Sequence, residues 1–334
     1  MKIVLVCRVY STHRSGGMPF VCADRAVHLA NGMGHDVHVL TTAHENGKAS
    51  DVVDGVTVHY LGNQPMEYAE AWHESCARKV SAINPDLIHL DSLDSNATPW
   101  WPAGSVAITS HGSTIGQLKA LQSSAVGGDD VPKQKINDLI EGCKRERAVL
   151  KTARAVVAVS EWERRLLSEI YQLPNVHVVK NPIPDYFFGT RKSPKNRDVR
   201  KRVFLCAAVN SFGTRGFHLA TNAASLNRQT VHFAKGSFTR REMVEQYDHC
   251  DALLLPTSLA SGSDLTVDEA LARRRPVIAT RIGAYSGRQG VVNFTRDDVH
   301  ELAAVMAGDL PLVLPNEENR CSNHCEKWLG VVCQ

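Results

Sequence analysis

Residues 255–280 read LPTSLASGSDLTVDEALARRRPVIAT. They contain a loop and the start of a helix whose backbone groups are suited to bind a phosphate. A predicted strand ends in Pro-Thr-Ser, a loop follows, acidic residues open a helix, and a second strand begins at residue 276. The first backbone N–H groups of a helix, together with the helix dipole, form an anion-binding site. We therefore expect a phosphate to lie against five consecutive residues, Gly262, Ser263, Asp264, Leu265 and Thr266.

Two other loops that follow predicted strands are candidate ligand contacts. Gly16 and Gly17 come after the first strand, and glycines let the backbone approach a diphosphate or an acceptor closely. Any strand-to-helix turn can also use such a pair. His111, in Ser-His-Gly, ends another strand at the edge where open α/β sheets bind ligands. We expect His111 to face a ligand, with a purely structural histidine as the alternative.

The elements that position these loops alternate between strands and helices. In the first half we predict strands at 2–7, 36–41, 56–60, 86–90, 106–110, 155–159 and 176–179, and helices at 21–33, 68–83, 136–152 and 161–171. In the second half we predict strands at 202–208, 230–234, 252–255, 276–280 and 290–294, and helices at 217–226, 240–249, 266–273 and 297–307. This alternation indicates an α/β fold with parallel sheets covered on both faces.

The length and the proline positions indicate two domains. A chain of 334 residues exceeds the usual size of one core. Pro182 and Pro184 halt regular structure, which places a boundary there. We predict an N-terminal domain over residues 1–185, a second domain over 186–315, and a terminal segment, 316–334, that packs back on the first domain.

Composition excludes several classes of protein. The net charge of +3 indicates neither a nucleic-acid-binding protein nor a membrane-surface protein. No window approaches the roughly 20 apolar residues that span a bilayer, and MKIVLVCRV is expected to be a strand, not a signal peptide. Nine scattered cysteines suggest reduced thiols, so we expect a cytoplasmic, soluble protein.

Local clusters of positive charge leave a polyanionic partner open. In residues 191–202, seven of twelve are Lys or Arg, which is typical of a solvated linker but also suits a phosphate-rich ligand. The triplet at residues 273–275 and the pair Arg240 and Arg241 extend this second interpretation.

A longer series of motifs carries a family resemblance. In order they are Gly16-Gly17, Leu29-Ala30, Gly34-His35-Asp36-Val37, Pro85-Asp86-Leu87-Ile88-His89, Ser110-His111-Gly112, Val159-Ser160-Glu161, Asn181-Pro182, Arg215-Gly216, Leu255-Pro256-Thr257-Ser258, Glu269-Ala270-Leu271-Ala272 and Pro276-Val277-Ile278. By their order and spacing the chain resembles a retaining glycosyltransferase of the large glycogen synthase-like and sucrose synthase-like family. The resemblance implies the GT-B fold, in which two Rossmann-like, doubly wound domains face each other across a cleft.

The resemblance also implies roles for individual residues. Arg215 matches the cation that stabilises the leaving phosphate, and Glu269 matches the acid that hydrogen-bonds the ribose. The partner cation falls at Asn210 and the sugar-binding acid at Ser261, both of them neutral. Asp264 is the alternative sugar contact, and either it or Asp268 can instead stabilise the helix dipole. Lys235, Arg281 or Arg288 could replace the missing cation.

The implied reaction moves a hexose, with UDP-glucose as the expected donor, to an acceptor hydroxyl without a metal or other cofactor. His111 would face the donor sugar, and the leaving phosphate would accept the proton of the acceptor, so no protein nucleophile is needed. One alternative acceptor is a hydroxymethylated base in DNA, flipped out of the duplex. A non-catalytic protein that binds a nucleotide sugar or a glycan is the other alternative.

Two parts of the chain depart from the family pattern. Only one strand, at 230–234, is predicted between Asn210 and Asp251, where the family has two, so the second domain is shortened. The tail CSNHCEKWLGVVC brings Cys321, His324, Cys325 and Cys333 together, which suits zinc. We favour a packing role for this tail.

Overall fold

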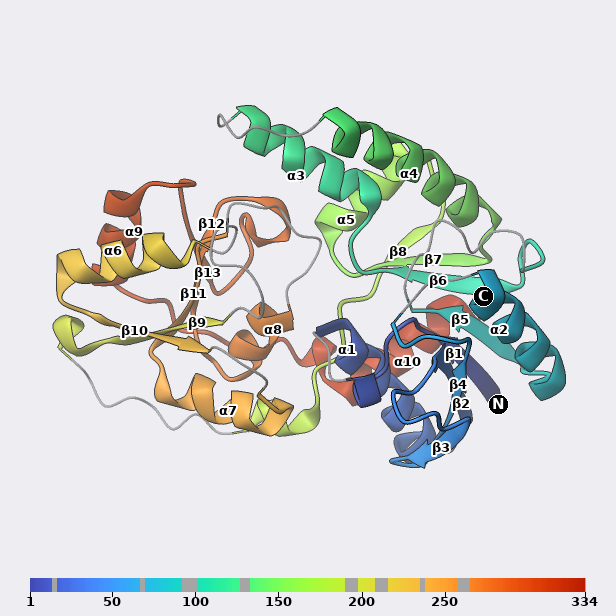
Figure 1. Ribbon diagram of the computed structural model, residues 1–334. Coiled ribbons are helices and arrows are strands. Elements are labelled where there is room, and N and C mark those ends of the chain that lie inside the picture. Colours follow the sequence, from blue (N-terminus) through green and yellow to red (C-terminus); the bar gives the residue numbers. More distant parts are fainter. Residues whose placement is uncertain are drawn as a thin grey trace. The chain divides into compact units, whose positions relative to one another are not determined.

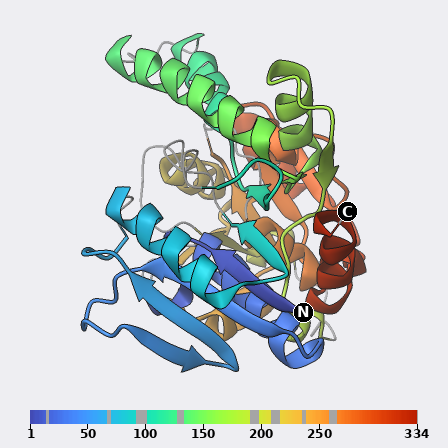
Figure 2. The same cartoon turned by 90° about the vertical axis from the view of Figure 1, so that its right-hand side faces the viewer.

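The computed structural model describes residues 1–13, 17–66, 70–91, 101–126, 133–189, 198–207, 216–234, 238–257 and 265–333. The chain forms two compact units (Figures 1 and 2). Unit 1 comprises Met1–Leu118, Val131–Pro182 and Cys321–Gln334, and unit 2 comprises Lys119–Asp130 and Ile183–Arg320. In sequence order, the divisions fall after Leu118, Asp130, Pro182 and Arg320.

Unit 1 is built on an eight-stranded sheet in the order β3-β4-β2-β1-β5-β6-β7-β8. Its strands are β1 (Lys2–Val6), β2 (Asp36–Thr42), β3 (Ser50–Val53), β4 (Val56–Leu61), β5 (Leu87–Leu90), β6 (Val106–Ser110), β7 (Ala155–Ala158) and β8 (Val176–Val178). All neighbouring pairs are parallel except β3 and β4. The chain runs to opposite sides of β1, through β2 and through β5, so a topological switch point lies between β1 and β5.

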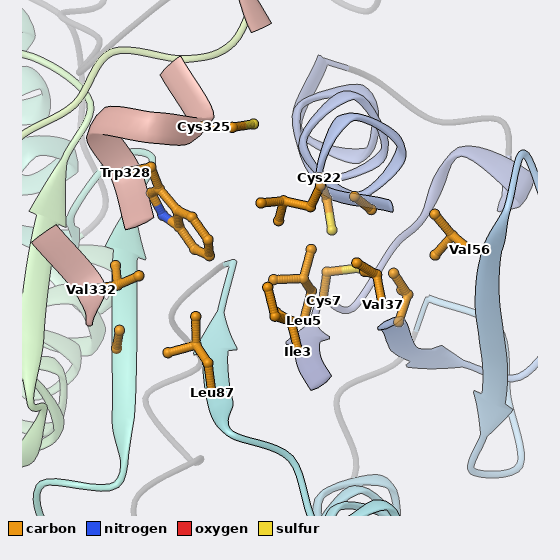
Figure 3. Packing of buried hydrophobic residues seen from close by; sticks show 14 of the residues in the cluster. Ile3, Leu5, Cys7, Cys22, Val37, Val56, Leu87, Cys325, Trp328 and Val332 are labelled. Atoms are coloured by element: carbon orange, nitrogen blue, oxygen red, sulfur yellow. The ribbon is translucent and has the colours of Figure 1, made fainter. Parts of the chain in front are cut away.

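The helices of unit 1 cover both faces of this sheet. They are α1 (Gly17–Val27), α2 (Glu70–Ile83), the first part of α3 (Thr114–Val126) up to Leu118, α4 (Lys133–Thr152), α5 (Glu161–Arg165) and α10 (Cys321–Val332). Side chains alternate along a strand, so Ile3 and Leu5 pack on the face that α1 and α10 cover, whereas Val4 and Val6 pack against the other helices. Trp328 of α10 is fully buried in the first of these cores (Figure 3).

Unit 2 contains a smaller, wholly parallel sheet in the order β10-β9-β11-β12-β13. Its strands are β9 (Val203–Ala207), β10 (Thr230–Ala234), β11 (Ala252–Leu255), β12 (Val277–Thr280) and β13 (Val291–Phe294). Its helices are α6 (Phe217–Asn227), α7 (Arg240–His249), α8 (Leu265–Ala272) and α9 (Val299–Ala307). α7 and α8 contribute to one core, and α6 and α9 to the other. Between β9 and β11 the described residues form one strand, β10, where one was predicted.

The sequence-based predictions missed the strand β3 and the helices α3 and α10, and they misplaced the start of α1. Edge strand β3 alternates half-buried with exposed residues, so it carries no clear apolar face. In α3 the polar and small residues interrupt the apolar spacing, with Gly116 fitting closely against the Trp162 ring. The first helix begins at Gly17, not at residue 21, and ends in a π-helical turn, His28–Gly32.

All nine cysteines are free thiols, and seven of them are buried. None of the described helices has the length and apolar character needed to cross a membrane.

Candidate functional site

A buried ionic cluster lies at the carboxyl ends of the central strands of unit 1. Asp91 follows β5 directly and His111 follows β6, and these two strands are parallel neighbours. His111 Nε2 lies 3.1 Å from Asp91 Oδ1. Arg25, on α1, forms an ion pair with the same carboxylate oxygen. Three elements that are distant in sequence therefore meet at the edge where doubly wound sheets bind ligands.

The electrostatics of this cluster keep Asp91 ionised. Burial opposes ionisation, but the Arg25 guanidinium and the hydrogen bond from His111 outweigh it and hold the pKa of the Asp91 carboxyl well below its usual range. The side chain of Asp91 is fully buried, whereas His111 keeps 10% of its side-chain surface exposed. The cluster thus contains a fixed negative charge with one partly accessible imidazole.

The loop that carries His111 is fixed at both ends by one buried acid. Glu163 Oε1 accepts hydrogen bonds of 2.7 Å from Ser110 Oγ and from the Ser113 backbone N–H. Burial raises the pKa of Glu163, and the two serine contacts act against that rise. Because Ser110 and Ser113 flank the dipeptide His111-Gly112, Glu163 limits the movement of the His111 backbone.

The backbone N–H of Thr114, the first residue of α3, is bound by a second buried acid, Glu146. Glu146 accepts from the Thr114 N–H at 2.9 Å and from the Tyr171 hydroxyl at 2.5 Å. Burial raises the pKa of Glu146 to about 7. The N-terminus of α3 is therefore occupied by protein carboxylates and is not a site for an external anion.

In unit 2, Glu269 lies on α8 within a buried polar group. Tyr247 OH donates to Glu269 Oε2 at 2.8 Å, and Arg240 Nε lies 3.1 Å from Oε1. The Arg240 guanidinium in turn lies over the Phe187 ring, 5.2 Å from its centre. Glu269 is only 4% exposed, so its charge is balanced inside unit 2.

The first turn of α8 carries a second acid with its own partners. Asp268 forms an ion pair with Arg288 and accepts a hydrogen bond of 2.9 Å from Asn319 Nδ2. Arg288 is thereby held beside the first turn of α8, which begins at Leu265 and Thr266. Arg281, the other described candidate for the missing cation, is exposed.

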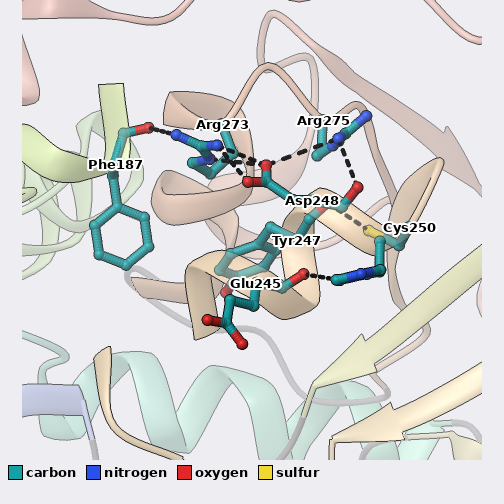
Figure 4. A network of polar contacts seen from close by, with 8 residues as sticks. Phe187, Glu245, Tyr247, Asp248, Cys250, Arg273 and Arg275 are labelled. Atoms are coloured by element: carbon teal, nitrogen blue, oxygen red, sulfur yellow. Dashed lines mark hydrogen bonds and ion pairs between the residues drawn. The ribbon is translucent and has the colours of Figure 1, made fainter. Parts of the chain in front are cut away.

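The arginine triplet at residues 273–275 is a structural feature, not a surface for a polyanion. Arg273 binds Asp248 through two nitrogens, Nε at 3.0 Å and Nη2 at 2.5 Å, and Arg275 Nη2 donates to the Asp248 carbonyl at 2.9 Å (Figure 4). Arg273 and Arg275 are buried, as is Arg240. The expectation that these three guanidinium groups face an acceptor was wrong, because each is used inside unit 2.

Many of the predicted site residues cannot be placed. Outside the described residues lie Gly16, Asn210, Arg215, Lys235, Ser261, Gly262, Ser263 and Asp264, together with residues 191–197 of the basic run. Gly17 is the first residue of α1, and Leu265 and Thr266 begin α8. The structure brings His111 together with Asp91 and Arg25, and Glu269 together with Tyr247 and Arg240.

Sequence reasoning overlooked Asp91, Arg25 and Glu163. Asp91 could have been found, because it directly follows a predicted strand whose neighbour ends at His111. Arg25 and Glu163 give no such indication, since each lies inside a helix and depends on the tertiary fold.

The tail carries the histidine and cysteines that were considered for zinc. Among the residues that the structure describes, no group of three or more His, Cys, Asp or Glu side chains is placed to hold a metal ion. His324 and Cys325 are buried in unit 1, whereas Cys333 is exposed.

Solved structures define the class of fold. Sucrose-phosphate synthase from Thermosynechococcus elongatus matches with a TM-score of 0.65 at 14% identity, covering 99% of this chain and 94% of that chain. The lipopolysaccharide outer core galactosyltransferase WaaB matches with a TM-score of 0.64 at 14% identity, covering 100% and 99%. HepE from Anabaena, in complex with UDP-glucose, matches with a TM-score of 0.61 at 14% identity, covering 99% and 95%. The two parallel-sheet units thus form the GT-B fold, as the sequence predicted.

Sequence comparison then gives the family. Residues 15–185, just over half of the chain, match glycosyltransferase family 4. The chain belongs to that family, which confirms the resemblance seen in its motifs. No curated protein matches the chain by sequence.

Proposed function

We propose that the protein is a retaining glycosyltransferase that moves a hexose, with glucose as the first candidate, from a nucleoside diphosphate sugar to an acceptor hydroxyl. The observation that carries this proposal is family membership across residues 15–185, combined with a GT-B fold over nearly the whole chain. The HepE structure that matches with 99% coverage contains UDP-glucose, which makes a UDP-sugar the first donor to test.

In this proposal the nucleotide binds to unit 2 through Glu269. A carboxylate can accept about four hydrogen bonds, and Tyr247 and Arg240 occupy one position on each oxygen. We assign to this carboxylate the hydrogen bonds from the ribose hydroxyls that the family resemblance implies. Because Tyr247 and Arg240 fix the carboxylate, the ribose would meet an acceptor that needs no reorganisation on binding.

The leaving diphosphate requires positive charge where its own negative charge grows. We assign that work to Arg215 and to the N-terminus of α8, where Leu265 and Thr266 lie. Arg288, held by Asp268 in the first turn of α8, is our candidate for the cation that the family pattern places at Asn210. In this account the phosphate accepts the proton of the acceptor hydroxyl, so neither a protein nucleophile nor a metal ion takes part.

A donor screen tests the proposal. The purified chain is incubated with a panel of nucleotide sugars, and release of the nucleoside diphosphate is measured with and without EDTA and with and without hydroxymethylated DNA. We expect hydrolysis or transfer that EDTA leaves unchanged and that Arg215→Ala abolishes, and NMR of the product should show the anomer of the donor.

Arg78→Ala, which changes an exposed arginine of α2 outside the proposed machinery, should retain full turnover. Full activity in Arg215→Ala would refute its assigned role. Binding of a nucleotide sugar without turnover of any donor would instead identify a non-catalytic binding protein, and stimulation only by modified DNA would identify the acceptor.

A further inference from the structure

The cluster around Asp91 defines which ring nitrogen of His111 carries a hydrogen. Asp91 is fully buried and ionised, and a carboxylate in that state can only accept hydrogen bonds. His111 Nε2 lies 3.1 Å from Asp91 Oδ1, which is hydrogen-bonding distance. The hydrogen must therefore be on Nε2. In the neutral imidazole the lone pair is then on Nδ1.

The position of Asp91 is in turn fixed by Arg25. Both Arg25 and His111 bind the same oxygen, Oδ1, so the carboxylate cannot rotate away from one without losing the other. Arg25 is itself only 1% exposed. A buried guanidinium needs a negative partner, so the ion pair prevents Asp91 from adopting another rotamer.

Helix α10 completes the arrangement from the far end of the sequence. Arg25 Nε donates to His324 Nε2 at 3.3 Å, and the Arg25 guanidinium lies 5.0 Å from the centre of the Trp328 ring. Burial and the nearby Arg25 charge hold the pKa of His324 well below its usual range, so His324 is neutral and can accept this hydrogen bond. The series α10, Arg25, Asp91 and His111 is continuous and almost entirely buried.

We propose that Asp91 and Arg25 are positioning residues that fix His111 in its Nε2–H tautomer and direct the Nδ1 lone pair to a hydroxyl group of the substrate. The proposal rests on the proposed function for the presence of a sugar hydroxyl, and on the geometry alone for the tautomer. His111 is the member of the cluster with an exposed surface, 10% of its side chain, whereas Asp91 and Arg25 are sealed. A cluster with only a structural role would not need an accessible imidazole at this edge of the sheet.

The decisive variant replaces the ion pair by apolar groups of similar size. Arg25→Met combined with Asp91→Leu removes both buried charges together, a change that often leaves folding intact, whereas removal of one partner leaves an uncompensated charge. This double variant keeps His111 and removes the acceptor for its Nε2–H. Asp248→Asn, in unit 2, is the matched control, because that carboxylate is also bound by arginine but lies far along the chain from His111.

The first readout is the tautomer, measured by long-range ¹H–¹⁵N correlation spectra of histidine-labelled protein, with His111 identified by the loss of its signals in His111→Gln. We expect the Nε2–H tautomer in the wild type and in Asp248→Asn, and a substantial Nδ1–H population in the double variant. An Nδ1–H tautomer in the wild type, or an unchanged tautomer in a folded double variant, would overturn the proposal.

The second readout is kinetic and uses the donor-hydrolysis assay. In the double variant we expect kcat to fall roughly 100-fold, the size of a misplaced reacting group. The KM for the donor should stay within about threefold, because the nucleotide contacts are in unit 2. Unchanged kcat in a folded double variant would refute the positioning role. If the wild type shows the expected tautomer but turns over no donor, the proposed function fails and the geometry of His111 stands.

Discussion

Two carboxylates bind buried arginines in a similar way at opposite edges of their sheets: Asp91, which is buried in unit 1, and Asp248, which is half-buried in unit 2. Asp91 follows the carboxyl end of β5, next to His111. Asp248 lies in the last turn of α7, shortly before β11 begins, and so belongs to the amino-end edge. Ligands of doubly wound sheets bind at the carboxyl ends of the strands. The edge of the sheet at which an ion pair lies therefore indicates whether it can serve a ligand site, and its charge alone does not.

The two clusters also differ in what they leave accessible. Around Asp248, Arg273 is 6% exposed and Arg275 is fully buried, so the cluster joins α7 to the end of α8 and its accessible group is the carboxylate itself, 21% exposed, not an imidazole. Around Asp91, the partly exposed His111 is held by the same kind of charge. We therefore expect changes at Asp248 to affect stability and changes at Asp91 to affect chemistry as well.

The largest expected effect is at Asp248. Asp248→Ala leaves Arg273 and Arg275 buried without their carboxylate, which should lower the free energy of unfolding by roughly 3–5 kcal/mol. Urea denaturation measures this loss. Asp51→Ala, which removes an exposed partner of Lys48, is the control and should change stability little. A loss at Asp248 no larger than at Asp51 would break the comparison.

The next effect concerns the hydrogen bond to Glu269. Tyr247→Phe removes the hydroxyl that donates at 2.8 Å, and hydrogen bonds to charged groups contribute about 1.5–3 kcal/mol. We expect a loss of that size in denaturation and a higher KM for the donor. Tyr10→Phe is the control, because the buried Tyr10 hydroxyl has no hydrogen-bond partner among the described residues. Equal behaviour of the two variants would show that Tyr247 does not support Glu269.

The third prediction concerns the pH dependence of stability caused by Glu146, a buried carboxylate. Glu146 is bound by Tyr171 and Thr114, and burial raises its pKa to about 7. A raised pKa in the folded state gives stability that is present below the unfolded pKa, near 4.5, and is lost as the pH rises through 7. Urea midpoints from pH 4.5 to 8 should therefore fall by more in the wild type than in Glu146→Gln, by an amount on the order of 1–2 kcal/mol. Parallel curves for the two proteins would contradict this assignment.

The smallest effect is at the end of α8, between the two buried arginines. Arg274 has φ of 56°, and the Arg274 and Arg275 N–H groups donate to Leu271 O and Ala270 O, which is the Schellman arrangement. This position favours glycine, so Arg274→Gly should raise the free energy of unfolding by about 0.5–1 kcal/mol. Arg281→Gly, at an exposed position outside the positive-φ set, should not stabilise the protein. Destabilisation by Arg274→Gly would mean that its side chain matters more than its backbone.

Much of the fold could be predicted from apolar periodicity. The strands β6, β10 and β11 and helix α7 have the predicted bounds, because each has a clear pattern and polar or turn residues at its ends. The helix α3 and the edge strand β3 were missed, since their burial depends on neighbours that lie far away in sequence. Trp328 of the tail is buried in the core of unit 1.

The candidate site was harder to predict. Glu269 and His111 were identified by spacing within motifs, but their partners were not, because Arg25, Arg240 and Tyr247 lie inside helices whose facing is set by tertiary packing. At residues 273–275 the sequence suggested a binding role that the structure does not support. Three consecutive arginines suggested a surface for a polyanion, but Arg273 and Arg275, at the end of α8, bind Asp248 inside unit 2.

Calorimetric titration with UDP-glucose tests the central claim most directly, that unit 2 binds a nucleotide sugar at the carboxyl-end edge through Glu269. We predict binding by the wild type, unchanged binding by Asp248→Asn, and affinity at least about tenfold weaker in Glu269→Gln, equivalent to roughly 1.4 kcal/mol. Wild-type affinity in Glu269→Gln, or no binding of any nucleotide sugar by the wild type, would contradict the account.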